Sequence, residues 1–94
     1  MSTLKIKLEL SSHFIRERKR YVKNSSRRFK DYKRAVSIFV SKPGYPSLNL
    51  EKLQNNKGIL TIRLNKSDRI FFIWKSKDTA LFVDIGKHDK YRKY

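Results

Sequence analysis

The sequence contains no cysteine, only three glycines and two prolines, and only eight acidic residues among 94. The absence of cysteine excludes disulfide bonds and zinc–thiolate sites, and it is compatible with a reducing compartment. No stretch approaches the roughly 20 apolar residues of a membrane-spanning helix. The first ten residues, MSTLKIKLEL, lack the apolar run of a secretory signal. We therefore expect a cytoplasmic protein with no membrane partner.

Positive charge dominates what is present. The 24 Lys and Arg residues outnumber the 8 Asp and Glu residues, which gives a formal net charge of +16. Self-repulsion at this level destabilises a compact chain unless an anionic partner neutralises it. Nucleic acid, an acidic protein and a membrane surface are the candidate anionic partners. A nearly all-basic surface favours nucleic acid among them. A protein that is simply basic and soluble is the alternative.

Hydropathy patterning predicts a single α+β domain over residues 1–94. Period-two alternation indicates strands, and helical spacing of apolar residues, with serines in front as caps, indicates helices. The strands are expected at 4–10, 59–65, 69–74 and 79–86, and the helices at about 12–23 and 26–40. Short turns between the last three strands favour antiparallel pairing. We predict the order β-α-α-β-β-β, with both helices packed on one face of a small antiparallel sheet.

Residues 43–58 are predicted to form a linker, because both prolines and two of the three glycines lie there. Leu48, Leu50 and Leu53 are expected to hold this linker against the core. With the helices on one sheet face, the other face is expected to stay open unless a partner covers it.

Arg63 and Arg69 are candidates for a site on that open face. Arg63 alternates out of phase with the apolar residues of its strand, and Arg69 begins the next strand across a short turn. A hairpin can bring both guanidinium groups to one surface, where each can hold a phosphate through two hydrogen bonds. Ordinary surface arginines are the alternative.

The segment IGKHDKYRKY, residues 85–94, is either a solvated basic tail or part of a working surface. His88 lies just beyond the last predicted strand, and an imidazole suits proton transfer near neutral pH. Tyr91 and Tyr94 can stack on unpaired bases, deliver a proton, or simply cover the sheet edge. Glu51 is a candidate general base, although a carboxylate among arginines more often forms structural salt bridges.

The sequence shows no His/Asp/Glu cluster with metal-ligand spacing, no glycine-rich phosphate loop and no Ser-His-Asp arrangement, so we expect no metal and no cofactor. RNA carries its own nucleophile, the 2′-hydroxyl. A protein has only to align that hydroxyl with the adjacent phosphate, stabilise the added charge and move two protons. We therefore expect metal-free cleavage of RNA. Nearby cations are expected to bind the RNA: Lys57, Lys66, Lys87, Lys90 and Arg92.

The chain resembles the RelE/ParE superfamily of bacterial toxins from type II toxin–antitoxin pairs over nearly its whole length. The order and spacing of four segments carry the resemblance: LNLEKLQ, GILTIRL, DRIFFIW and DIGKHDKY. The resemblance implies a toxin that an acidic cognate antitoxin holds inactive. For RelE-like members it implies an endoribonuclease that cleaves mRNA, commonly on the ribosome.

The resemblance also implies roles for individual residues. Arg63 and Arg69 match basic positions that contact the scissile phosphate. His88 matches a position that carries arginine or histidine, with an acid–base or charge-stabilising role. Tyr91 and Tyr94 compete for the role of a terminal aromatic residue.

Two further positions bear on proton transfer. Glu51 resembles a carboxylate that one subgroup uses as a base. Thr61 occupies a position where some members carry a catalytic lysine, and Lys66 or Lys87 would have to compensate for that difference.

Three alternatives stay open at this point. ParE-like members share the fold but bind DNA gyrase and have no nuclease activity. His88 near the tyrosines and the dense positive charge favour RNA and the ribosome instead. The chain can also be a non-enzymatic nucleic-acid binder, or a toxin that has lost its activity.

Overall fold

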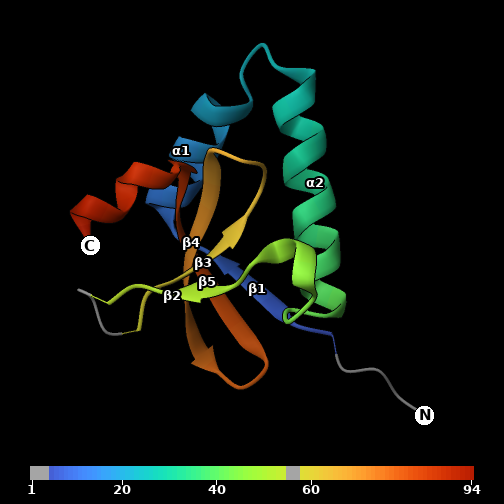
Figure 1. Ribbon diagram of the computed structural model, residues 1–94, viewed down its shortest axis with the longest axis vertical. Coiled ribbons are helices and arrows are strands. Elements are labelled where there is room, and N and C mark those ends of the chain that lie inside the picture. Colours follow the sequence, from blue (N-terminus) through green and yellow to red (C-terminus); the bar gives the residue numbers. More distant parts are fainter. Residues whose placement is uncertain (1–4, 55–57) are drawn as a thin grey trace.

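The computed structural model describes residues 5–54 and 58–94 (Figure 1). The elements along the chain are β1 (Lys7–Leu10), α1 (Ser12–Val22), α2 (Ser26–Ser41), the 3-10 helix η1 (Pro46–Leu48), β2 (Glu51–Lys52), β3 (Leu60–Arg63), β4 (Asp68–Ser76), β5 (Thr79–Lys87) and the 3-10 helix η2 (His88–Lys93). The predicted α+β class and element order are confirmed. Within the described ranges, every helix is too short or too polar to cross a membrane.

The strands form one five-stranded sheet in the order β1-β5-β4-β3-β2. The pairs β3–β4 and β4–β5 are antiparallel, as predicted, and so is the unpredicted pair β2–β3, whereas β1 runs parallel to β5. Strand β1 pairs with a strand far away in the sequence, so no tight turn imposes the antiparallel direction. The sheet is therefore mixed, and β2 adds a short edge strand inside the segment predicted to be a linker.

Serine caps begin both helices, as the sequence predicts. The Ser11 hydroxyl accepts a hydrogen bond from the Phe14 backbone N–H at 3.0 Å, and the Ser25 hydroxyl accepts one from the Arg28 N–H at 3.2 Å. Each cap satisfies one of the free N–H groups in the first helical turn.

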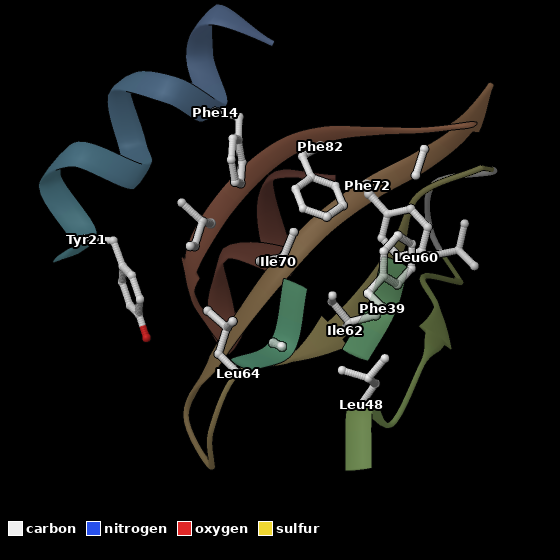
Figure 2. Packing of buried hydrophobic residues seen from close by; sticks show 13 residues of the cluster. Phe14, Tyr21, Phe39, Leu48, Leu60, Ile62, Leu64, Ile70, Phe72 and Phe82 are labelled. Carbon is white, nitrogen blue, oxygen red and sulfur yellow. The ribbon is translucent and has the colours of Figure 1, made fainter. Parts of the chain in front are cut away.

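The core lies between the helices and one face of the sheet (Figure 2). Phe14 of α1 meets Phe82 of β5 with ring centroids 5.3 Å apart, and Phe39 of α2 meets Phe72 of β4 at 5.0 Å. All four rings are fully buried. Such aromatic pairs add to the stability from burial by about 0.5–1.5 kcal/mol each.

Three apolar residues lie at the surface: Ile15 and Phe29, which belong to the helical apolar spacing, and Leu50, which was predicted to pack on the core. Ile15 and Phe29 are 39% and 48% exposed, because the buried faces of their helices centre on other residues, such as Phe14 in α1. In the linker, Leu48 is buried as predicted, whereas Leu50 is 36% exposed.

Candidate active site

A row of cross-strand partners crosses the sheet face opposite the helices. Glu51 on β2 lies opposite Thr61 on β3, Thr61 lies opposite Phe71 on β4, and Phe71 lies opposite Asp84 on β5. Directly paired residues project to the same face of a sheet. The row therefore has a carboxylate at each end, Glu51 on β2 and Asp84 on β5, with Thr61 and Phe71 between them.

Arg63 on β3 lies directly opposite Arg69 on β4 in the neighbouring row. This confirms that the hairpin places the two arginines side by side. Arg63 is exposed, whereas Arg69 is only 6% exposed. Burial, and then the positive charge of Arg63, lower the pKa of Arg69, although a guanidinium stays charged. Like charges at opposed positions destabilise a sheet, so this pair favours a bound anion.

Hydrogen bonds to the β3–β4 turn fix the Arg69 guanidinium. Its Nη1 donates to the carbonyl oxygens of Asn65 at 2.9 Å, Asp68 at 3.0 Å and Lys66 at 3.4 Å. Among the buried side-chain nitrogen and oxygen atoms of the described residues, Arg69 Nε is the one without a hydrogen-bond partner. An unpaired buried donor of this kind costs stability.

A polar cluster around Asn65 holds that turn against the helices. The Asn65 side-chain amide donates to Asp31 Oδ2 at 2.9 Å and to Asp68 Oδ2 at 3.0 Å, while its oxygen accepts from the Asp68 N–H at 3.0 Å. The Tyr21 hydroxyl donates to Asp68 Oδ2 at 2.5 Å. Because Asp31 lies in α2 and Tyr21 in α1, the turn that carries Arg69 is tied to both helices.

His88 and the candidate carboxylate share one hollow beside these rows. The hollow has a volume of about 260 Å³, and its lining residues are Glu51, Lys52, Leu53, Gln54, Thr61, His88, Tyr91 and Tyr94. The His88 backbone N–H donates to the Ser67 carbonyl at 2.7 Å, so the β3–β4 turn also fixes the start of η2. The His88 and Tyr91 rings lie 5.4 Å apart.

A buried carboxylate anchors η2 to the sheet. Asp84 is fully buried, and its Oδ1 accepts from Lys90 Nζ at 2.9 Å and from the Ile85 N–H at 2.8 Å. Its Oδ2 accepts from the Tyr94 hydroxyl at 2.7 Å. Lys90 Nζ also donates to Glu17 Oε1 on α1 at 3.0 Å. We call Asp84, Lys90, Tyr94 and Glu17 the Asp84 cluster.

The pKa values in the Asp84 cluster follow from these bonds. Burial tends to raise the pKa of Asp84, but hydrogen bonds from Lys90 and Tyr94 outweigh it and hold that pKa below its usual range. Burial tends to lower the pKa of Lys90, but the bonds to Asp84 and Glu17 raise it overall. Burial and the bond to Asp84 raise the pKa of Tyr94. Tyr94 is therefore a neutral phenol whose proton is already donated.

Gly86 makes room for the lysine of this cluster. Its φ of +151° is a backbone conformation that residues with a side chain rarely adopt. A Cβ at this position would lie 2.8 Å from Lys90 Cε. Glycine at this position therefore avoids both the backbone strain and the contact with the Lys90 side chain.

No protein-family model matches the sequence, and a search of curated proteins finds no match either. Solved structures do match. A YoeB/ParE toxin from Agrobacterium tumefaciens has a TM-score of 0.73 at 13% identity, covering 88% of this chain and 99% of its own. YafQ in the E. coli DinJ–YafQ toxin–antitoxin complex has a TM-score of 0.74 at 15% identity, covering 92% and 96%. The Staphylococcus aureus YoeB dimer has a TM-score of 0.66 at 16% identity, covering 89% and 98%.

This chain has the RelE-like fold. The fold that the sequence resemblance implied is thereby confirmed. Within the RelE-like fold, the structure places the side chains of Arg63 and Arg69 opposite each other, and Glu51, His88, Tyr91 and Tyr94 around the adjacent hollow.

The predicted RNA-binding cations occupy different places in the RelE-like fold. Lys66 in the β3–β4 turn, Lys87 at the end of β5 and Arg92 in η2 are exposed. Lys57 lies outside the described residues. Lys90 does not fit the predicted role, because its ammonium group is turned onto Asp84 and Glu17.

Asp84 and Glu17 are two members of the site that the sequence alone does not reveal. Asp84 looks like the ordinary polar member of an alternating strand, and Glu17 like one charge on a helix rich in basic residues. Glu17 and Lys90 are 73 positions apart, so no local pattern connects them. Only the motif DIG, in which a glycine follows an acidic residue at the end of a strand, offers a signal.

Proposed function

We propose that this chain is the toxin of a toxin–antitoxin pair and acts as an endoribonuclease on mRNA, in association with the ribosome. The observation that carries the proposal is the Arg63–Arg69 pair, set beside a hollow lined by Glu51 and His88. A paired cationic site next to a carboxylate and an imidazole can hold a phosphodiester and move protons around it.

In this proposal Arg63 binds the scissile phosphate directly, because it is the exposed member of the pair. Arg69 is nearly buried and held by the turn, so it supplies a fixed positive charge behind the phosphate. Preorganised charge of this kind stabilises a transition state without the cost of reorganising the site.

The chemical step uses the RNA's own nucleophile. The 2′-oxygen attacks the adjacent phosphorus while Glu51 or His88 takes its proton. The bond from phosphorus to the 5′-oxygen breaks, and the other residue gives that oxygen a proton. The products are a 2′,3′-cyclic phosphate and a 5′-hydroxyl. Tyr91, at 37% exposure, is the terminal aromatic residue available to stack on a base, since the Tyr94 hydroxyl is bound to Asp84.

The step requires no metal ion. Among the described residues, no group of three or more His, Asp or Glu side chains is placed to hold one. Because the RNA supplies the nucleophile, and Arg63 and Arg69 supply the positive charge, we expect cleavage to continue in the presence of EDTA.

An acidic antitoxin is the proposed protein partner. The solved YafQ relative was crystallised with DinJ as a toxin–antitoxin complex. A net charge of +16 on this chain would speed the association of an acidic partner.

Purified protein and defined RNA test this function. The chain should cleave RNA with or without added ribosomes, faster with them, and a 2′-deoxy substitution at the cleavage site should abolish the cut. A gyrase supercoiling assay run alongside separates the ParE-like alternative. Inhibited gyrase together with intact RNA would overturn the proposal.

A further inference from the structure

A second hollow, separate from the one that contains His88, lies between α2 and the edge of β3. Its volume is about 500 Å³, and it is lined by Arg34, Tyr45, Arg63 and Lys66 above an apolar floor that includes Leu48 and Leu64. We call it the Tyr45 groove. Strand β2 pairs with β3 only at Leu60 and Thr61, so the rest of this edge has no strand beside it.

The Tyr45 groove combines positive charge with an exposed aromatic ring. The described residues that line it include three cations and no carboxylate. The Arg34 side chain is 61% exposed; its Nη2 donates to the Leu64 carbonyl at 2.9 Å and lies 3.5 Å from Asp31 Oδ1. Tyr45 is 46% exposed, so its ring is accessible to a base.

Arg63 connects this groove to the candidate active site. It lines the Tyr45 groove and also lies opposite Arg69 on the sheet. An RNA strand whose phosphate lies on Arg63 therefore has the Tyr45 groove directly beside that phosphate. The geometry fits a single-stranded polyanion that carries flat rings, since phosphates pair with Arg and Lys and bases stack on tyrosine.

We propose that the Tyr45 groove is a subsite for single-stranded RNA, which binds a nucleotide flanking the scissile phosphate. In this subsite the Tyr45 ring stacks on the base, and Lys66 and Arg34 pair with the next phosphate. The inference rests on the proposed nuclease function and adds the place where the substrate is held outside the reacting bond. An acidic segment of a protein partner would also be attracted to the cations of the groove. It carries no base, however, to stack on the exposed Tyr45 ring.

The test uses RNA made non-cleavable by a 2′-deoxy substitution at the mapped cleavage site. The base analogue 2-aminopurine is placed one, two or three nucleotides from that site, on either side, because its fluorescence is quenched when it stacks. Wild-type protein should quench it at one position on one side. Tyr45→Ala should abolish the quenching and weaken binding about tenfold, while Tyr45→Phe should preserve both, because the ring remains.

Charge variants provide the matched controls. Lys66→Gln should lower the salt dependence of binding by about one released counterion. Lys77→Gln, at the exposed turn between β4 and β5, should have a smaller effect because that turn lies at the other end of the hairpin. The loop around Tyr45 is held by backbone hydrogen bonds, from the Tyr45 N–H to the Lys42 carbonyl and from the Leu48 N–H to the Tyr45 carbonyl. Because these bonds do not involve the Tyr45 side chain, its substitution should leave the fold intact.

The outcomes separate the subsite from the function. If wild-type and Tyr45→Ala proteins bind and cleave RNA equally, the subsite is overturned and the nuclease proposal stands. If Tyr45→Ala leaves RNA binding unchanged but weakens binding of an acidic partner protein, the groove belongs to that partner and the RNA subsite is again overturned. If the wild-type chain binds no RNA, both proposals fail together.

Discussion

The carboxylate of Asp84 on β5 and the ammonium group of Lys90 in η2 form an ion pair at 2.9 Å, with the carboxylate fully buried. The pair joins the end of the sheet to the helix that carries His88 and Tyr91. It therefore determines where two of the proposed active-site side chains lie.

Removing Lys90 should destabilise the fold strongly. Lys90→Met leaves a buried carboxylate without its main counter-charge, and breaking a buried pair in this way costs about 3–5 kcal/mol. The double variant Asp84→Asn/Lys90→Met should recover part of that loss. Lys93→Met, an exposed residue of the same helix, is the control for the loss of one positive charge. Urea unfolding at neutral pH gives the free energy of unfolding of these three variants and the wild type. Equal stability of Lys90→Met and Lys93→Met would show that the Asp84–Lys90 pair does not stabilise the fold.

The same pair should shape the dependence of stability on pH. The pKa of Asp84 is lowered in the folded state, so its contribution is fully present above the unfolded value of about 3.9 and is lost as the pH falls through the folded value. The pKa of Lys90 is raised, so its contribution is present below about 10.4 and is lost as the pH rises through the folded value. The free energy of unfolding of Asp84→Asn/Lys90→Met should therefore vary less at both extremes of pH. Parallel profiles for the wild type and the double variant would contradict this assignment.

Arg63 and Arg69 should respond differently to truncation. Arg63→Ala relieves a like-charge contact, so stability should stay constant or rise slightly, while cleavage should fall about 100-fold, or ~3 kcal/mol, through loss of a phosphate ligand. Arg69→Ala should reduce both stability and cleavage, because it also removes the bonds to the turn. Thr61→Ala should affect cleavage less than Arg69→Ala does. Cleavage rates and thermal unfolding, measured on the same preparations, check this ranking, and the reverse order would count against the proposed phosphate site.

Asn65 should act on cleavage through the position of Arg69. Asn65→Ala removes the hydrogen bonds that the Asn65 amide donates to Asp31 and Asp68, and it loosens the β3–β4 turn. The expected cost in stability is about 1–3 kcal/mol. Cleavage should fall at temperatures where the variant is still folded. Ser67→Ala in the same turn is the matched control, because its hydroxyl bond to Asn65 is exposed. Full activity in folded Asn65→Ala would show that the turn does not position Arg69.

The sequence predicts elements where short-range periodicity is strong. The serine caps, both helices and the β3–β4 hairpin follow from local patterns, and so does the placement of Arg63 opposite Arg69. The parallel pairing of β1 with β5 does not, since it joins residues such as Lys7 and Thr79 that lie far apart in the chain.

The candidate site is predictable only in part, for the same reason. His88 and Glu51 were identifiable by their chemistry, whereas Asp84 and the contacts of Lys90 depend on tertiary structure. Lys90 shows the limit most clearly, because one lysine in a basic segment looks like its neighbours until its buried partner is known.

The most direct test of the account is the mapping of RNA ends in cells that express the chain inducibly, wild type beside His88→Ala. If the chain is a ribonuclease, its wild-type form should cause growth arrest and new RNA 5′-hydroxyl ends. Neither should occur with His88→Ala, whose circular dichroism and unfolding midpoint should match the wild type because His88 is exposed. Cleavage by His88→Ala at the wild-type rate, or intact RNA in arrested wild-type cells, would contradict the proposed function.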